Sequence, residues 1–132
     1  MSPPLQRVLY VEDEPDIRSI AELALETVGQ LTICSCSSGE LAIEAAEAFA
    51  PHLLLLDVMM PGMDGPETLR RLREIPALSE IPAVFMTAKV QPDEVSHLKA
   101  LGAFDVLPKP FDPMTIADEL RKIFDIATLM AV

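Results

Sequence analysis

The chain has few cysteines, and its apolar residues do not form long uninterrupted runs. It contains two cysteines, one tyrosine, no tryptophan and five glycines in 132 residues. A chain of this length buries enough apolar surface for one core without disulfides or a structural metal. Its apolar runs are far shorter than the ~20 residues that cross a bilayer. Met1 to Arg7 lack the three regions of a signal peptide, so we expect a cytoplasmic protein that does not enter a membrane.

Motifs that would bind nucleotides or nucleic acids are also missing. No GxxxxGK[ST] loop occurs, no GxGxxG follows the first apolar run, and the GxSxG motif of hydrolases is absent. The net charge is −11, which argues against direct binding to a phosphate backbone. The one basic cluster, Arg70, Arg71 and Arg73, is interpreted as the solvated C-terminal end of a helix, where positive charge is favourable.

The cysteines and histidines are interpreted as structural residues. Cys34 and Cys36 lie two apart on an expected strand, which puts their side chains on the same face. Metal binding would need further soft ligands nearby, and none follows in the sequence, so they are expected to be small buried residues. His52 precedes a strand at the far edge from the acids described below, and His97 lies within an expected helix. Both are expected to be ordinary surface residues.

Short apolar strands alternate with amphipathic helices along the chain. The expected strands are residues 7–11, 31–36, 53–56, 83–86 and 103–107. The expected helices begin at Pro15, Ser37, Asp64, Pro92 and Asp112, and residues 74–82 are expected to form a loop. Ser37 with Glu40, and Asp64 with Glu67, have the spacing of a capping box.

This alternation predicts a single α/β domain over residues 1–132, with a core from about 7 to 124. Five strands and five helices predict a doubly wound parallel sheet of the flavodoxin-like (βα)5 class. Its expected strand order is 2-1-3-4-5. Residues 125–132 are apolar at their end, and they either extend the last helix or form the stub of a linker in a longer protein.

Polar residues collect where the expected strands end. Glu12 and Asp13 follow the first strand, Asp57 the third, Thr87 the fourth and Lys109 the fifth. Right-handed crossovers bring all of these ends to one edge of the sheet. The order 2-1-3-4-5 makes the first and third strands neighbours, so the Glu12–Asp13 pair faces Asp57. Considered alone, Asp57 could be an aspartate that only begins a turn. The polar residues at the other strand ends favour a functional site instead.

Three carboxylates in one crevice point to a bound cation and to phosphate chemistry. Like charges this close raise one another's pKa or recruit a cation, and oxygen ligands alone select a hard divalent ion such as Mg²⁺. Lys109 adds an ammonium group and Thr87 a hydroxyl. Together these groups suit phosphoryl transfer, in which catalysis is mostly positioning and neutralisation of charge. Asp57 is the expected nucleophile and would form an aspartyl phosphate.

Four segments resemble the response-regulator receiver domain of two-component signalling. They are LYVEDEPDIR, LLLLDVMMPGMDGPE, VFMTAK and LPKPF, in this order, and the resemblance extends from about Arg7 to Phe124. It implies that Asp57 is the phosphate acceptor and that a sensor histidine kinase or a histidine phosphotransfer protein is the donor. The implied magnesium ligands are Glu12, Asp13, Asp57 and the backbone carbonyl of Met59. Thr87 is then expected to contact the phosphoryl group and Lys109 to pair with it.

Two residues depart from the pattern of that family. Glu12 is one methylene longer than the aspartate that is common at its position. Val106 stands three residues before the lysine, where the family usually has Tyr or Phe as a switch residue. Phe104 is expected to face the same side of the strand, one step further from the site. Met59 and Lys89, two residues beyond Asp57 and Thr87, are expected to tune the lifetime of the phosphoryl group; the alternative is that both are plain loop residues.

The resemblance implies a phosphorylation switch, with no activity on an external substrate. The switch would signal through a downstream protein, a phosphorelay or an output domain absent from this sequence. A homodimer through the last strand and its flanking helices is a further expectation. A receiver-like interaction module that no longer depends on phosphorylation is the alternative, supported by Val106 and Glu12. A Mg²⁺-dependent phosphatase with an aspartate nucleophile ranks last, because Met59 stands where its second acid is expected.

Overall fold

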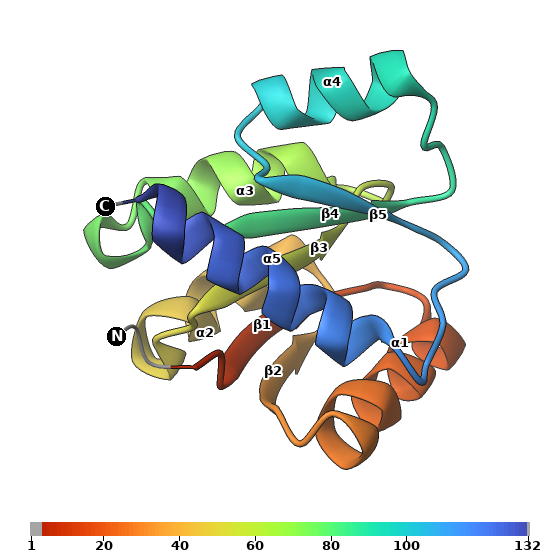
Figure 1. Ribbon diagram of the computed structural model, residues 1–132. Coiled ribbons are helices and arrows are strands. Elements are labelled where there is room, and N and C mark those ends of the chain that lie inside the picture. The colour runs from red at the N-terminus through yellow and green to blue at the C-terminus, as the bar shows by residue number, and fades with distance from the viewer. Residues whose placement is uncertain (1–3, 132) are drawn as a thin grey trace.

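Five parallel strands form the middle layer of the protein (Figure 1). The computed structural model describes residues 4–131. Residues 1–3 and 132, which include the start of the Met1–Arg7 segment and both ends of the expected domain, lie outside the described residues. The strands are β1 (Arg7–Val11), β2 (Thr32–Cys36), β3 (Leu53–Asp57), β4 (Ala83–Thr87) and β5 (Asp105–Pro108). Their order is β2-β1-β3-β4-β5, so the predicted doubly wound sheet is confirmed.

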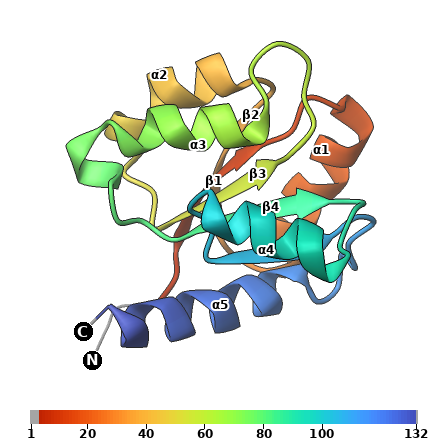
Figure 2. The ribbon, with the colours of Figure 1, turned by 90° about the horizontal axis from the view of Figure 1, so that it is seen from above.

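The helices cover both faces of the sheet (Figures 1 and 2). They are α1 (Pro15–Glu22), which continues as the π-helical segment η1 (Leu23–Val28), α2 (Gly39–Phe49), α3 (Gly65–Arg73), α4 (Pro92–Ala100) and α5 (Ile116–Met130). Helices α1 and α5 pack on one face, and α2, α3 and α4 on the other. Among residues 4–131, every helix is too short or too polar to span a bilayer.

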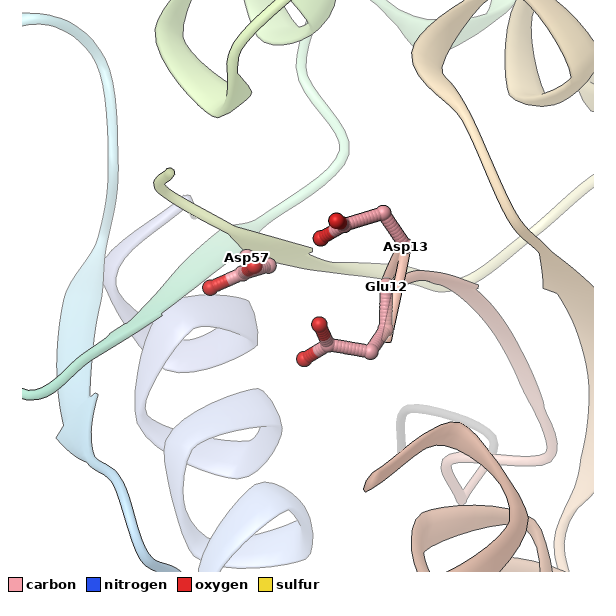
Figure 3. Close-up of side chains that lie close together, drawn as sticks. All are labelled: Glu12, Asp13 and Asp57. Atoms are coloured by element: carbon pink, nitrogen blue, oxygen red, sulfur yellow. The ribbon is translucent and has the colours of Figure 1, made fainter. Parts of the chain in front are cut away.

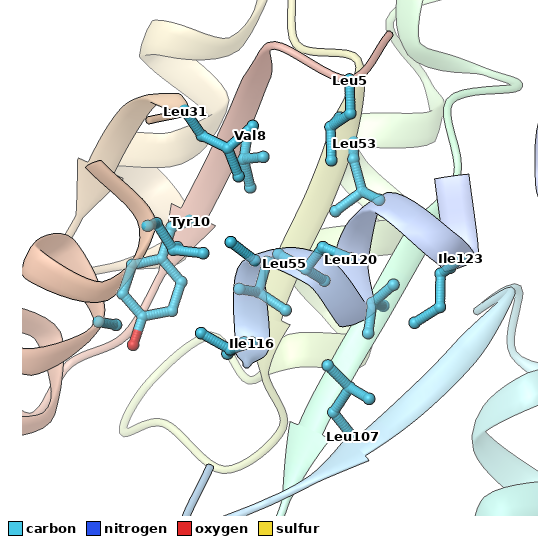
Figure 4. Close-up of a cluster of buried hydrophobic side chains, with 14 of the residues drawn as sticks. Leu5, Val8, Tyr10, Leu31, Leu53, Leu55, Leu107, Ile116, Leu120 and Ile123 are labelled. Carbon is cyan, nitrogen blue, oxygen red and sulfur yellow. The ribbon is translucent and has the colours of Figure 1, made fainter. Parts of the chain in front are cut away.

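The apolar runs of the central strands are continuous because both of their faces are covered. All five residues of β3 and all five of β4 are buried. Alternate side chains serve different cores: Tyr10 and Leu55 pack with Leu120 beneath α1 and α5 (Figure 4), whereas Leu54 and Leu56 pack toward α2, α3 and α4.

Several element boundaries differ from those expected. Ser38 rather than Ser37 caps α2, and its hydroxyl oxygen accepts from the Leu41 N–H at 3.2 Å. A 3₁₀ turn, η2 (Pro76–Leu78), interrupts the expected loop of residues 74–82. Helix α5 begins at Ile116, four residues late, because the Asp112 carboxylate accepts from the Met114 N–H at 2.9 Å and forms a turn ahead of the helix.

Arg73 is not part of a solvated basic cluster, so that interpretation is wrong for one of its three arginines. Its guanidinium donates to the carbonyl oxygens of Leu78 (3.1 Å), Gly102 (3.2 Å) and Ile81. It therefore ties the end of α3 to the η2 segment and to the turn before β5. Arg70 and Arg71 are exposed and pair with Glu67, as a solvated helix end predicts.

His52 also differs from the ordinary surface residue that was expected. Its Nδ1 accepts hydrogen bonds from the backbone N–H groups of Gln6 (3.2 Å) and Arg7 (3.1 Å). Its ring centroid lies 6.2 Å from that of Phe124 on α5. The imidazole therefore joins the start of β1 to the start of β3 and to the last helix.

Candidate functional site

Glu12, Asp13 and Asp57 meet at the carboxyl ends of the two central strands. Glu12 and Asp13 directly follow β1, and Asp57 is the last residue of β3. One carboxylate oxygen from each residue lies within 4.8 Å of the others, and the three side chains converge on one space (Figure 3). Glu12 is 1% exposed and Asp57 is 5% exposed. The structure thus brings together the acids that the sequence placed at one sheet edge.

Lys109 is the cation that faces this acidic cluster. Its Nζ lies 3.0 Å from Glu12 Oε1 and 3.0 Å from Asp57 Oδ1, and it donates to both. The Lys109 backbone N–H donates to the Thr87 carbonyl at 2.9 Å, which extends the β4–β5 pairing and holds the lysine in place. One ammonium group therefore bridges two of the three carboxylates.

The pKa values of this pair reflect burial and charge together. Burial raises the pKa of Glu12, and the charge of Asp57 raises it further, while the hydrogen bond from Lys109 opposes both effects. For Lys109, burial alone would lower the pKa, but the hydrogen bonds to Asp57 and Glu12 outweigh it and the pKa is raised. The ammonium form is thus the state in which Lys109 bridges the acids.

A small cavity of about 140 Å³ opens beside Asp57. It is lined by Asp57, Met59, Thr87, Ala88, Lys89 and Lys109. The Thr87 hydroxyl oxygen accepts from the Lys89 N–H at 3.0 Å, so its own proton remains available to a group entering the cavity. Met59 and Lys89 are both exposed, and they border the cavity rather than lying elsewhere in their loops. The cavity therefore places Asp57 beside Met59, Thr87, Lys89 and Lys109, whereas Glu12, Asp13 and Val106 are not part of its lining.

The loop after β3 lies close against the backbone of Asp57. The Gly65 N–H donates to the Val58 carbonyl at 2.8 Å. A Cβ atom added at Gly65 would lie only 2.3 Å from the Asp57 carbonyl oxygen. A larger residue at the start of α3 would therefore push against the backbone that positions Asp57.

Val106 and Phe104 do not face the same side, so that expectation is wrong. Val106 packs with the core under α2, α3 and α4, whereas Phe104 packs with the core under α1 and α5. Strand β5 begins at Asp105, so Phe104 lies before the regular pleat; its N–H donates to the Ala83 carbonyl at 2.7 Å. No aromatic side chain therefore occupies the Val106 side of β5.

Sequence reasoning missed two residues near the acids. Tyr10 is fully buried two residues before Glu12, and its hydroxyl has no hydrogen-bond partner among the described residues. Burial and the charges of Glu12 and Asp57 raise its pKa, so it stays neutral. Arg18 Nη1 donates to the carbonyls of Glu12 (2.8 Å) and Asp13 (3.4 Å). The strand alternation that places Tyr10 and Glu12 on one face was the available signal.

An apolar groove of about 440 Å³ lies on the other side of Lys109. It is lined by Ile17, Ile20, Lys109, Pro110, Phe111 and Pro113, from α1 and the segment after β5. Ile20 is 49% exposed, so its side chain is accessible from the groove. The acidic cluster thus has an apolar surface beside it.

Comparisons with known proteins agree on one family. Residues 8–121 match the family described as the response regulator receiver domain. The chain is 35% identical over 116 residues to the transcriptional regulatory protein CseB of Streptomyces avermitilis, covering 88% of this chain and 48% of that protein. It is also 35% identical over 109 residues to an uncharacterized 14.6 kDa protein of Leptolyngbya boryana, covering 83% and 82%. The chain thus spans about half the length of the first relative and most of the second.

Solved structures show the same fold. The chemotaxis protein CheY4 of Vibrio cholerae superposes with a TM-score of 0.83 at 28% identity, covering 90% of this chain and 98% of that one. A putative response regulator from Chloroflexus aurantiacus superposes with a TM-score of 0.81 at 28% identity, covering 93% and 99%. These likenesses extend over nearly the whole described chain.

Proposed function

Because this chain belongs to the response regulator receiver family, we propose that it is a phosphorylation switch in which Asp57 accepts a phosphoryl group with the help of Mg²⁺. One observation carries the proposal. Three carboxylates converge at the end of β3, and the Lys109 ammonium lies 3.0 Å from both Glu12 and Asp57. A cluster with this excess of negative charge suits a divalent cation.

The donor set fits magnesium. Carboxylate oxygens of Glu12, Asp13 and Asp57, with the backbone carbonyl of Met59, would hold the ion. When bound, Mg²⁺ supplies neutralisation of charge on the phosphoryl oxygens. The carboxylate of Glu12 is held by two donors. Its Oε1 accepts from Lys109 Nζ, and its Oε2 accepts from the Glu14 N–H at 3.2 Å. These two hydrogen bonds fix the position of the longer side chain.

In the proposed transfer, a carboxylate oxygen of Asp57 forms a bond to phosphorus as the bond from phosphorus to the donor's imidazole nitrogen breaks. The imidazole keeps the bond electrons and takes up a proton. Lys109 then pairs with a phosphoryl oxygen, and the Thr87 hydroxyl donates to another. The chain would thus catalyse its own phosphorylation and hydrolysis and act on no external substrate.

The switch would follow from the new charge. The Lys109 ammonium would shift toward the new phosphoryl oxygens from its present acceptors, Glu12 and Asp57, and the Thr87 hydroxyl would turn into the cavity. These movements reach β5 and the surfaces of α4 and α5 on either side of it, where a change of population alters protein contacts. Val106 is half-buried on this path and offers only a small side chain to transmit the change.

The partners are proposed to be proteins. The apolar groove beside Lys109 suits the side chains of a donor protein, namely a sensor histidine kinase or histidine phosphotransfer protein. The signal is proposed to pass to another protein, to a phosphorelay or to an attached domain. Formation of a homodimer through β5 and its flanking helices is a further proposed output. The net charge of −11 disfavours direct binding to nucleic acid.

Intact mass after incubation with a small phosphodonor tests this function. One phosphoryl increment is expected with Mg²⁺, none without it, and none for Asp57→Asn. Asp93→Asn, an exposed aspartate on α4, is the matched control and should be phosphorylated normally. A natural protein that is folded and binds Mg²⁺ but takes up no phosphoryl group would instead favour the alternative, a module that interacts without phosphorylation.

Met59 and Lys89 are proposed to tune the phosphoryl lifetime, because both border the cavity beside Asp57. Met59→Ala and Lys89→Ala are each expected to change the Mg²⁺-dependent autodephosphorylation rate by about threefold or more, a difference of about 0.6 kcal/mol in the barrier. Met130→Ala, at a similarly exposed methionine near the end of α5, is the control. Unchanged rates for both cavity variants would make these residues plain loop residues.

A further inference from the structure

The two cysteines of the chain come together away from the acidic site. Cys34 and Cys36 lie on the edge strand β2, and their sulfur atoms are 3.9 Å apart. Both line an open groove of about 510 Å³ at the carboxyl end of that strand, together with Arg18 from α1 and Glu44 from α2. Cys34 is half-buried and Cys36 is buried, so the groove is the side from which the pair can be reached.

The strand geometry disfavours a disulfide between them. A strand rises about 3.3 Å per residue, so side chains two residues apart leave it roughly 6.6 Å apart and nearly parallel. A disulfide needs Cβ atoms about 3.8 Å apart. Closing that gap would distort a backbone that is paired with β1 at both positions, Cys34 with Leu9 and Cys36 with Val11.

The same geometry suits a shared metal ion. Two sulfurs bound to one ion, with metal–sulfur bonds of about 2.3 Å, lie at most about 4.6 Å apart. The observed 3.9 Å lies within that limit, so both sulfurs reach one ion without movement of the backbone. The sulfurs are thus already placed for chelation and not for oxidation to a bridge.

We propose that Cys34 and Cys36 chelate one soft, monovalent metal ion of the copper(I) class. No third cysteine, histidine or carboxylate of residues 4–131 completes a cluster with them, whereas zinc sites are usually four-coordinate. Thiolates select copper(I), which accepts two ligands. Each thiol releases its proton to solvent as the ion binds, so the bound complex carries one net negative charge.

Arg18 offsets that charge. Its guanidinium lines the groove and is held there by hydrogen bonds to the carbonyls of Glu12 (2.8 Å) and Asp13 (3.4 Å). A divalent ion on two thiolates would be neutral and would gain less from this arginine. The proposal rests on β2 and its groove and does not depend on phosphorylation of Asp57.

An anaerobic titration of the reduced full chain with copper(I), against a coloured competing chelator, tests the site. The natural chain is expected to take one ion, and Cys34→Ser and Cys36→Ser are each expected to bind about 100-fold more weakly, because one tethered ligand is lost. The double variant C36S/S37C keeps two thiols but moves one to an exposed neighbouring residue, so it should also lose the chelate. Circular dichroism checks that each variant is folded.

Four outcomes of this titration, repeated with zinc, would overturn the proposal. They are no transfer of copper(I) to the natural chain, equal retention by the single serine variants, equal retention by the relocated pair, and zinc binding as tight as copper(I) binding. A variant lacking both cysteines measures any binding by the seven methionines, which is subtracted. A loss of two hydrogens in the intact mass after mild oxidation, with an unchanged circular dichroism spectrum, would show that the two cysteines form a disulfide instead.

Discussion

Asp13 has no hydrogen-bond or ion-pair partner for its carboxylate among the described residues, although it lies beside two other acids. The positive charge of Lys109 forms ion pairs with Glu12 and Asp57 only. Without a cation, Asp13 therefore repels its neighbours, and this repulsion opposes folding. The unfavourable charge is what a bound divalent ion, as proposed above, would offset.

Asp13→Asn is expected to raise the free energy of unfolding by about 1 kcal/mol in magnesium-free buffer, because it removes one of three like charges. The same variant should bind Mg²⁺ more weakly. Urea unfolding with and without Mg²⁺ measures both effects. Asp16→Asn, at an exposed position in the first turn of α1, is the control and should lose a few tenths of a kcal/mol. Destabilisation by Asp13→Asn would show that the acids do not repel one another in the folded chain.

His52 makes the stability of the fold depend on pH. Its Nδ1 can accept from Gln6 and Arg7 only when that nitrogen carries no proton. Burial lowers the pKa of His52, and the nearby charge of Arg7 lowers it further. The unfolded chain therefore takes up the proton first as the pH falls. The contribution of His52 to stability is complete above about pH 6.5, the ordinary pKa, and is lost as the pH falls through the lower value of the folded state.

His52→Asn is expected to remove this part of the pH dependence, because an amide oxygen can accept the same bonds but does not titrate. The measurement is the free energy of unfolding by urea between pH 7.5 and pH 5 for both proteins. The natural chain should lose more stability than the variant over this interval. Parallel curves would mean that His52 stays neutral in both states or that its two hydrogen bonds contribute nothing. His97→Asn, at an exposed position on α4, is the matched control.

At the scale of elements, Arg73 joins segments that would otherwise be separate loops. It extends from the end of α3 to two carbonyls around η2 and to Gly102, 29 residues further along the chain. Gly102 itself adopts a φ of +117°, which favours glycine and turns the chain from α4 into β5. The strand that leads to Lys109 thus starts from a turn that this arginine holds.

Arg73→Ala is expected to lower the free energy of unfolding by about 2 kcal/mol, because three carbonyls lose a charged donor. Arg71→Ala, which breaks an exposed ion pair with Glu67, should change it by less than about 0.5 kcal/mol. Chemical denaturation of the two variants gives the comparison. Equal effects would mean that the Arg73 bonds are replaced by water at no cost.

At the scale of the whole molecule, the acidic site links cation binding to stability. A ligand that binds only the folded chain stabilises it by about 1.4 kcal/mol at ten times its dissociation constant. Adding Mg²⁺ is therefore expected to raise the unfolding temperature by roughly 3–6 °C at that excess, and chelation with EDTA should reverse the rise. Sodium chloride at equal ionic strength separates binding from screening of the net charge of −11.

The control for this prediction is the double variant D13N/D57N, which removes two of the three proposed carboxylate ligands and whose folding is checked by circular dichroism. Its unfolding temperature should respond to Mg²⁺ no more than to sodium chloride. An undiminished response would place the stabilising ion elsewhere on this acidic surface.

Local patterns predicted the elements of the fold well where the signal lies within a few residues. The apolar run before Asp57 is a strand, Asp64 caps α3 by accepting from the Glu67 N–H at 2.9 Å, and Gly29 ends the first helical stretch. The errors fall at boundaries where neighbouring residues compete. Ser38 rather than Ser37 caps α2, and Phe104 lies outside the pleat of β5.

The sequence by itself determined the alternation of strands and helices, the strongly acidic charge and the presence of acids, a hydroxyl and an ammonium at strand ends. These depend on periodicity and on the rule that parallel strands end at one edge. The tertiary structure alone decided which groups touch. Lys109 meets Glu12 across 97 residues and Asp57 across 52, and the side-chain contacts of His52 and Arg73 span 45 and 29. Contacts at such separations depend on how side chains pack between elements, and no local pattern of the chain encodes that.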